Sequence, residues 1–283
     1  MNLAPTLQLQ SIVYNNNPKD IERLVVSIKQ SVSLAKDKKM ISDAIYIIGD
    51  CSPTPFTDNA EVWAKRLSDD TLKVEYVFFD ENLGHGGGQN RLGLDSQYEI
   101  LGLVNPDVVA SPHLVENLIS ELSDDVAIAE AAQVPMEHPK DFDLTTLETS
   151  FATGCCFFIR QVLFKKIEGF DHKNFFMYCD DVDLSWRIRL LGKQIHYVPK
   201  AFVYHDHRID DTNTLVVGPA EFYYSALGGL MLAIKWGNTE RADQIVNALK
   251  NDPAYKDVYE EYSKLLENKL LPEVIENAST VAI

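Results

Sequence analysis

Three short clusters of acidic and imidazole side chains have the composition of a metal-dependent group-transfer site. Asp107 follows an apolar run and a proline in the segment 103–108, LVNPDV. Asp181 lies in the acidic run 180–183, and His205 follows a second apolar run. Mg²⁺ and Mn²⁺ prefer oxygen ligands, and they take only one or two protein carboxylates when a diphosphate supplies further oxygens. A carboxylate held in such a site can also accept the proton of a hydroxyl group.

Each cluster also has an ordinary structural explanation. The sequence Asn-Pro-Asp at 105–107 is common in turns. The acidic run at 180–183 begins a predicted helix, where carboxylates cap the backbone and complement the helix dipole. His205 and His207 share one face of a predicted strand, and histidines at such positions are often structural. The residues alone leave both interpretations open, and they do not decide which histidine would bind a metal.

A glycine-rich segment, NLGHGGGQNR at 82–91, separates a predicted strand from a predicted helix. Backbone without side chains can approach a diphosphate closely at a helix N-terminus. A dinucleotide-binding fingerprint would follow the first strand, whereas this segment follows the third, and the chain contains no P-loop sequence. A glycine-rich turn without a ligand is the alternative explanation.

The first half of the chain alternates strand-like and helix-like segments, which predicts an α/β fold with a mostly parallel sheet. The predicted strands span residues 7–14, 44–48, 73–79, 99–104 and 126–131, and the predicted helices span 18–35, 59–67, 89–94 and 112–122. Polar loops follow the first four strands at 15–17, 50–54, 80–88 and 105–107. The carboxyl-end loops of parallel strands hold the ligand in open α/β sheets, so we expect these loops to share one edge.

The second half has a different pattern. It contains an apolar run at 155–159, a short helix, the acidic cluster, two short strands at 195–198 and 201–204, and helices at 222–236, 241–249 and 255–266. The 283 residues, 46% of them hydrophobic, can form one large α/β domain with a helical appendage. We find no internal repeat.

The charge balance limits the partners. There are 26 Lys and Arg against 42 Asp and Glu, a net charge of -16, which disfavours nucleic acid. The first ten residues lack a basic start, and no apolar run is long enough to span a bilayer, so we expect a cytoplasmic chain. Cys51, Cys155, Cys156 and Cys179 lack the paired spacing of a metal site, and we predict reduced structural thiols.

Taken in order, these segments resemble glycosyltransferase family 2, whose members have the GT-A fold, over residues 7–236. The motifs that carry the resemblance are Ile12-Val13-Tyr14-Asn15, Asp50 with Ser52, the loop from Asn82 to Asn90, Asn105-Pro106-Asp107, Thr153-Gly154 and Ile159-Arg160 before Gly169-Phe170-Asp171, the segment from Phe175 to Leu184, and Tyr197-x-Pro199-x-Ala201 ending at His205. The resemblance implies a GT-A catalytic domain at 1–218, with a Rossmann-like donor-binding half at 1–131 and an acceptor-side half at 132–218. A C-terminal helical appendage follows at 219–283.

The family resemblance also implies a reaction and a set of roles. It implies an inverting transfer of one sugar from a nucleotide diphosphate donor to a glycan hydroxyl, with Asp181 as base beside Asp180. Asp107 and His205 would bind Mg²⁺ or Mn²⁺. The implied donor-binding residues are Tyr14, Asn15, Asp50, Ser52, Asn82, Gly84, His85, Gly87, Gly88, Asn90, Asn105 and Asp107, and the implied acceptor residues are Thr153, Gly154, Asp180 and Trp186.

The pattern is most similar to rhamnosyl- and galactofuranosyl-type transferases, which implies a dTDP- or UDP-sugar donor with rhamnose favoured. The acceptor would be a polysaccharide, a lipopolysaccharide or a lipid-linked glycan. Two residues depart from the family: His85 stands where many members carry an aromatic residue, and Asp180 replaces the commoner Glu. The Gln-x-x-Arg-Trp motif of processive members is absent, which favours addition of a single sugar.

Other classes stay open on the residues alone. A non-catalytic carbohydrate-binding or scaffold subunit could retain the same fold. A sugar-nucleotide pyrophosphorylase would need a glycine- and lysine-bearing loop after the first strand, and residues 15–18 provide none. A peripheral contact with the inner face of the plasma membrane and a homodimer through the C-terminal helices are further options, because the helix at 223–236 is rich in apolar residues.

Overall fold

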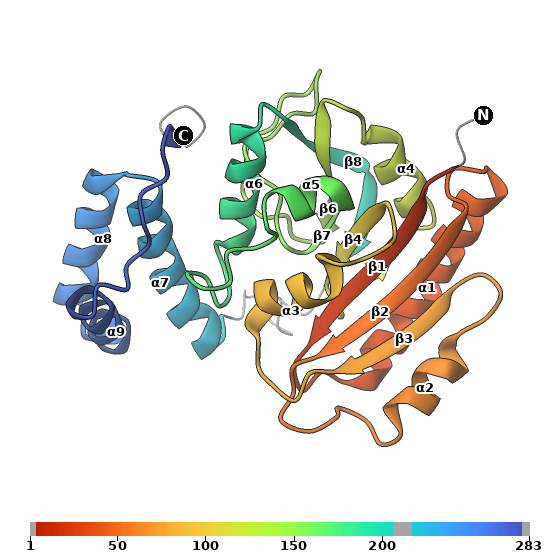
Figure 1. The fold of residues 1–283 in the computed structure, drawn as a ribbon, viewed down its shortest axis with the longest axis horizontal. Helices are drawn as coiled ribbons and strands as arrows, with labels where there is room; N and C mark the ends of the chain where they lie inside the picture. The colour runs from red at the N-terminus through yellow and green to blue at the C-terminus, as the bar shows by residue number, and fades with distance from the viewer. Residues whose placement is uncertain (1–3, 206–216, 279–283) are drawn as a thin grey trace.

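The structure is a computed structural model that describes residues 4–205 and 217–278. Within these residues an eight-stranded sheet forms the centre, in the order β3-β2-β1-β4-β7-β6-β8-β5 (Figure 1). The strands are β1 (Thr6–Val13), β2 (Asp43–Asp50), β3 (Lys73–Phe78), β4 (Ile100–Val104), β5 (Val109–Ala110), β6 (Val126–Val134), β7 (Cys156–Arg160) and β8 (Gln194–Tyr204). The helices are α1 (Pro18–Asp37), α2 (Ala60–Leu67), α3 (Gly84–Gly93), α4 (Leu114–Glu121), α5 (Gln161–Lys166), α6 (Asp180–Leu190), α7 (Pro219–Lys235), α8 (Thr239–Asn251) and α9 (Lys256–Glu267), with the short 3-10 helix η1 (Pro253–Tyr255).

The predicted α/β fold is confirmed, including the edge that the polar loops share. Strands β3, β2, β1 and β4 are neighbours and run parallel, so their carboxyl ends lie at one edge of the sheet. The other half of the sheet is mixed, because β7 runs antiparallel to both β4 and β6. The sheet is therefore less uniformly parallel than the alternation of elements suggested.

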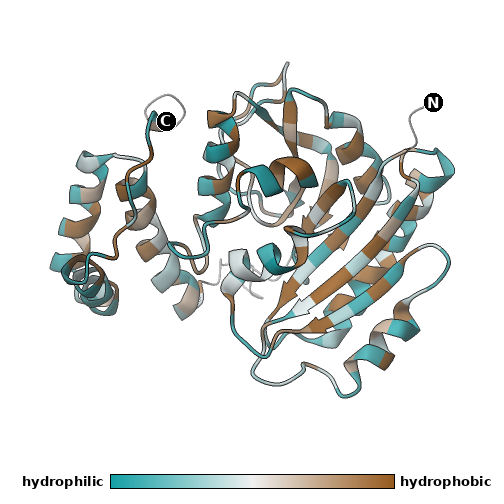
Figure 2. Ribbon diagram, viewed as in Figure 1, coloured by the Kyte–Doolittle hydropathy of each residue, from teal (hydrophilic) through white to brown (hydrophobic). Residues whose placement is uncertain are grey.

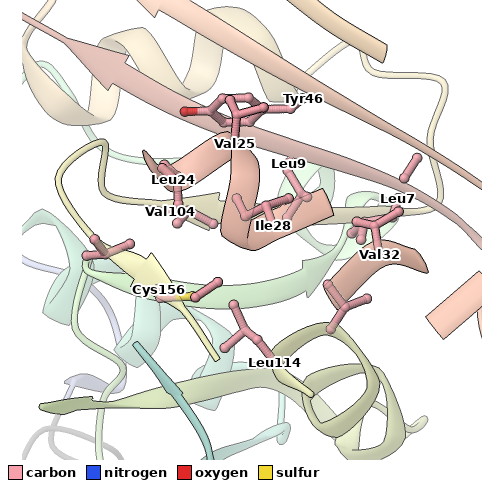
Figure 3. Close-up of a cluster of buried hydrophobic side chains, with 14 of the residues drawn as sticks. Leu7, Leu9, Leu24, Val25, Ile28, Val32, Tyr46, Val104, Leu114 and Cys156 are labelled. Atoms are coloured by element: carbon pink, nitrogen blue, oxygen red, sulfur yellow. The ribbon is translucent and has the colours of Figure 1, made fainter. Parts of the chain in front are cut away.

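Helices α1, α2 and α4 pack on one face of the sheet. Asn17 caps the N-terminus of helix α1, and its side chain accepts a hydrogen bond from the backbone N–H of Lys19. Its apolar residues recur at helical spacing, so Leu24 and Ile28 face the sheet and contact a core that includes Leu9 (Figure 3). This burial holds the strands in the register that places their carboxyl ends together.

Helices α3, α5 and α6 cover the opposite face over a second hydrophobic cluster. Phe157 of β7 is fully buried there with Phe164 of α5, Leu184 and Ile188 of α6, and Phe170 from the loop between these helices. In Figure 2 the hydrophobic residues of strands β1, β2 and β3 are interrupted by hydrophilic or intermediate ones, and the surface helices also alternate between hydrophilic and hydrophobic residues. The N-termini of α3 and α6 therefore lie on the same face of the sheet.

The glycine-rich segment is a helix and not the loop that we predicted. Helix α3 begins at Gly84, five residues before the predicted start at Gln89. A Cβ atom at Gly86 would lie 2.7 Å from the Cβ of Phe170, and one at Gly88 would lie 2.9 Å from the Ile12 side chain. The glycines are therefore required by the close packing of α3 on its neighbours, which local sequence patterns do not show.

The two predicted strands at 195–198 and 201–204 form one strand, β8. Its pairing with β6 shifts after Ala131 pairs with Val198, and Ala132 then pairs with Phe202. The extra residues on β8 bulge out without ending the strand. All four cysteines are free, as predicted, and Cys51, Cys155 and Cys156 are buried.

Helices α7, α8 and α9 form a group beside α6, away from β1, β2 and β3 (Figure 1). Their shared cluster of apolar residues includes Leu230, Met231, Leu249 and Val258. The helical character predicted for the C-terminal part is thus confirmed. Within the described residues no helix combines the length and hydrophobicity needed to cross a membrane.

A pair of glycine substitutions tests the packing of α3. We expect Gly86→Ala to lower the free energy of unfolding, because overpacking costs about 1–3 kcal/mol and the gain in helix propensity is only about 1 kcal/mol. Gly229 in α7 has no atom within 4 Å of an added Cβ, so Gly229→Ala should stabilise the protein by up to about 1 kcal/mol. Urea unfolding of both variants measures these changes. Equal stabilisation by the two would contradict the packing explanation.

Candidate active site

The structure brings together the two predicted metal ligands. Nε2 of His205, at the end of β8, lies 3.4 Å from Oδ1 of Asp107, which follows β4. The imidazole is largely buried and the carboxylate is partly exposed. One carboxylate oxygen and one imidazole nitrogen suit Mn²⁺ or Mg²⁺ whose remaining ligands are phosphate oxygens. Within the described residues no group of three or more His, Cys, Asp and Glu side chains could hold a metal alone.

Gln133 of β6 sets the orientation of the His205 ring. Its Oε1 lies 3.2 Å from Nδ1 of His205, and because an amide oxygen only accepts, the N–H at Nδ1 is the donor of this hydrogen bond. Nε2 is then the ring nitrogen directed towards Asp107. The Gln133 amide nitrogen in turn donates to the hydroxyl of Thr153 at 3.0 Å. Gln133 was not predicted as a site residue, since it belongs to no acidic or histidine-containing motif. His207 lies outside the described residues.

Asp181, the predicted base, lies at the start of α6, where the backbone N–H of Gly154 donates to its Oδ2 at 2.7 Å. Burial raises the pKa of Asp181 to about 6, and the charge of Asp180 acts in the same direction. The N–H of Gly154 and the charge of His85 oppose this rise. A carboxylate with a pKa near 6 is a stronger base than an ordinary aspartate and is still ionised at neutral pH.

Residues 154 and 155 join the base to the metal-ligand pair. The N–H of Gly154 binds Asp181, as described above, and the Sγ of Cys155 lies 3.6 Å from Nδ1 of His205. The carbonyl of Cys155 accepts from the N–H of Asn105, two residues before Asp107, at 2.8 Å. Because consecutive residues are only about 3.8 Å apart, side chains distant in sequence converge on one short segment.

Asp180 and Asp183 are buried and already paired. Asp180 Oδ2 lies 2.7 Å from Nδ1 of His85, in the first turn of α3. Asp183 accepts from Nε of Arg187 at 2.8 Å and from Nε1 of Trp236 at 3.1 Å. Asp183 therefore has a structural role, and of the three carboxylates only Asp181 is both partly exposed and free of a cationic partner at hydrogen-bond distance.

The carboxylate of Asp50 is fully buried, and its three hydrogen bonds organise the following loop. It accepts from the N–H of Ser52 at 2.8 Å, the N–H of Phe56 at 3.0 Å and the hydroxyl of Tyr76 at 2.6 Å. The Ser52 hydroxyl accepts from the N–H of Asn15 at 2.8 Å and so links two of the carboxyl-end loops. We predicted a direct contact of Asp50 with the nucleotide base, but the carboxylate has no exposed oxygen in this arrangement.

Two further predicted site residues have structural partners. The amide of Asn90 donates to the carbonyl of Phe170 and accepts from its N–H, both at 2.8 Å, so it holds the loop that carries Phe170. Trp186 packs against Trp236, with the ring centroids 5.1 Å apart. Both side chains therefore have partners in other parts of the chain.

The remaining predicted donor and acceptor residues occupy different environments. Tyr14, Asn15 and Asn82 are exposed at the edge of the sheet. Gly84, Gly87 and Gly88 are buried in α3, and Gly84, with φ of 68°, lies against the carbonyl of Phe176. The Thr153 hydroxyl is buried and donates to Oε1 of Glu130 at 2.6 Å. Glu130, which no motif of the sequence identified, pairs with Lys140 inside the protein. Its position within a mostly apolar strand is the one local feature that sets it apart in the sequence.

Comparison with solved structures identifies the fold. The fold is similar to that of a crystal structure of GalNAc-T7 with UDP, GalNAc and Mn²⁺, with a TM-score of 0.62 and 12% identity over 95% of this chain and 56% of that one. It is also similar to the mannosyltransferase PcManGT from Pyrobaculum calidifontis in complex with GDP-Man and Mn²⁺, with a TM-score of 0.57 and 16% identity over 98% and 83% of the two chains. The chain thus has the GT-A glycosyltransferase fold.

The sequence also matches a family model. Residues 11–184 match the model of glycosyl transferase family 2, and the chain belongs to this family. It is 34% identical over 74 residues to rhamnosyltransferase WbbL of Escherichia coli (strain K12), a match that spans 25% of this chain and 28% of that protein. The matched residues 11–184 include Asp107 and Asp181 but end before His205.

Lys235 connects the C-terminal helices to this site. Its Nζ lies 2.7 Å from both Asp171 and Asp183, and the side chain is 8% exposed. The predicted boundary at residue 218 marks a change in sequence pattern. Side chains on its two sides still pack together, because Lys235 of α7 is a buried cation next to Asp183 of α6.

Replacing Lys235 tests this connection. Lys235→Met removes the cation that pairs with Asp171 and leaves the buried Asp183 paired with Arg187. Removing one partner of a buried ion pair typically costs about 3–5 kcal/mol. We expect a lower midpoint of chemical unfolding and lower activity at temperatures where the variant stays folded. Lys256→Met removes an exposed pair with Glu260 and is the matched control, with no measurable change expected. If both variants unfold like the unmodified protein, the buried bridge does not stabilise α6.

Proposed function

We propose that this chain is an inverting, metal-dependent glycosyltransferase that adds one sugar from a dTDP- or UDP-sugar. Rhamnose is the favoured sugar, and the acceptor is a hydroxyl of a polysaccharide, a lipopolysaccharide or a lipid-linked glycan. The observation that carries this proposal is the convergence of Asp181 with Asp107 and His205 on residues 154–155. Similarity to a rhamnosyltransferase supports the choice of sugar, and similarity to a transferase solved with UDP and Mn²⁺ supports the donor and the ion.

In the proposed reaction the acceptor hydroxyl attacks the anomeric carbon while the bond from that carbon to the diphosphate breaks. Asp181 takes the hydroxyl proton, and the departing oxygen keeps the bonding electrons. Attack from the side opposite to the leaving group inverts the configuration and needs no covalent intermediate on the protein. The buried thiols of Cys155 and Cys156 therefore have no nucleophilic role.

Asp107 and His205 are the residues that would hold Mg²⁺ or Mn²⁺, and Gln133 keeps the His205 ring in the ligating orientation. The bound ion supplies Lewis-acid neutralisation of the charge on the leaving diphosphate. The exposed side chains of Tyr14, Asn15 and Asn82 lie at the edge that we assign to the donor. We propose that Asp50 acts there by shaping residues 51–56 and not by direct contact with the base. Gly154 and Thr153 form the acceptor side beside Asp181.

The first test removes the base. Asp181→Asn should lower turnover by about 10²–10⁴-fold, the usual scale for general-base catalysis, and leave nucleotide binding nearly unchanged. Release of nucleoside diphosphate from dTDP-rhamnose or UDP-sugars with Mn²⁺ measures turnover, and calorimetry with UDP or dTDP measures binding. Near-normal turnover in the variant would rule out Asp181 as base, and no release by the unmodified protein with any of these donors would favour a scaffold.

The second test addresses the metal ligands. Asp107→Ala and His205→Ala should each weaken the Mn²⁺-dependent part of UDP or dTDP binding by at least tenfold, since each removes one protein ligand. Mn²⁺ titration followed by electron paramagnetic resonance, with nucleotide present, reports binding without turnover. His113→Ala changes an exposed histidine at the start of α4 and should leave the midpoint unchanged. An unaltered midpoint in both ligand variants would exclude the pair as the metal site.

A further inference from the structure

His85 and Asp180, the two residues that depart from the family pattern, form a hydrogen bond with each other. The imidazole of His85 projects from the first turn of α3 towards the first residue of α6, where its Nδ1 lies 2.7 Å from Asp180 Oδ2. The ring is held on one side by Phe170, with centroids 5.3 Å apart and planes at 71°. A Cβ atom added to Gly154 would lie 3.3 Å from Cε1 of His85 and 3.6 Å from Oδ2 of Asp181. His85 and Asp181 therefore lie close together beside Gly154.

The charges around Asp181 make this pair more than a packing contact. Two consecutive carboxylates at 180 and 181 repel each other in a largely buried position. The charges that act on Asp181 are those of Asp180, its neighbour in the chain, and of His85 from α3. The charges of Asp181 and Asp180 add to burial in raising the pKa of the neighbouring Cys179 thiol. Lys235, a buried cation of α7, is occupied by Asp171 and Asp183, and Arg187 of α6 pairs with Asp183. When it is protonated, His85 supplies the counter-charge to the carboxylates at 180 and 181.

The directions of the pKa values agree with the geometry. Burial lowers the pKa of His85, but the charge and hydrogen bond of Asp180, with the charge of Asp181, outweigh burial and raise it overall. The charge of His85 lowers the pKa of Asp181, whereas the charge of Asp180 raises it more strongly. The two members of one hydrogen bond therefore act on Asp181 with opposite signs.

We propose that His85 is a positioning residue for the transfer reaction. As a cation it holds the Asp180 carboxylate in a fixed ion pair, turned away from the acceptor, and leaves Asp181 ionised as the one carboxylate of the pair that can take the hydroxyl proton. This inference rests on the proposed function of Asp181. It assigns to His85 a role through Asp180, in place of the donor contact that the sequence predicted for it.

The pH dependence of turnover tests the proposal. With Asp181 as base, kcat/KM of the unmodified protein should fall as the pH drops through about 6, because protonation removes the acceptor of the proton. His85→Gln should move this acid limb to higher pH, since it removes a positive charge. Asp180→Asn should move it to lower pH, since it removes a negative one. The His85→Gln variant should lose activity at pH 6 and approach the unmodified rate at pH 8, where Asp181 is ionised in both proteins.

His113→Gln is the matched control. His113, just before α4, also pairs with a carboxylate, that of Glu116 at 3.0 Å, but its side chain is exposed. Its pH profile should match that of the unmodified protein. The proposal would be overturned if His85→Gln lost activity by the same factor at every pH. It would also be overturned if the acid limbs of His85→Gln and Asp180→Asn moved in the same direction. Circular dichroism of each variant checks that it is folded before its profile is compared.

A titration without substrate separates this inference from the proposed function. The imidazole signals of ¹³C-labelled histidine, followed by NMR from pH 4 to 9 and assigned with His85→Gln, report the pKa of His85 directly. We expect a value above that of an ordinary histidine in the unmodified protein and a lower one in Asp180→Asn. An ordinary value in the unmodified protein would refute the ion pair even if no variant folds. Full turnover by Asp181→Asn, in contrast, would refute the proposed base and leave the His85 titration intact.

Discussion

Three carboxylates in the first turn of α6 have to be accommodated in a mostly buried position, and the rest of the site depends on how this is done. Burying a charge is costly unless it is paired. Asp180 is paired with the imidazole of His85, and Asp183 with the side chains of Lys235, Arg187 and Trp236. Asp181 receives only backbone N–H groups at hydrogen-bond distance, from 154 and 182. The fold thus pairs two of the three carboxylates with nitrogen-bearing side chains and leaves Asp181, which we propose as the base, with backbone partners.

This requirement explains why the surrounding elements approach so closely. The imidazole of His85 reaches Asp180 only because α3 packs tightly on Phe170, which in turn needs a glycine at position 86. Helix α7 approaches α6 closely enough for a Cβ at Gly228 to lie 2.8 Å from the carbonyl of Tyr178. The same approach buries Lys235 next to Asp183. Gly86, Gly228 and helix α7 therefore help to hold the first turn of α6 in place.

The polar side chains that connect the site were the hardest to predict. Asp107 and Asp181 stood out because carboxylates at strand or helix ends suit known chemistry. Gln133 orients His205, and Glu130 accepts a hydrogen bond from the Thr153 hydroxyl. Both residues lie within β6 and are not part of a motif at the end of a strand or helix. Their roles follow from hydrogen bonds across strands and loops that are distant in sequence, and a single sequence carries no record of such pairings.

The amino-acid sequence by itself determined the order of strands and helices, the edge where four loops meet and the identities of the candidate base and metal ligands. Periodicity and residue chemistry are local properties, and these features depend on them. Tertiary structure alone decided that the glycine-rich segment is helical, that Asp50 faces inward and that Asn90 and Trp186 bind other parts of the chain. Those outcomes depend on which surfaces come within contact distance, and that is fixed only when the whole sheet and its helices have packed.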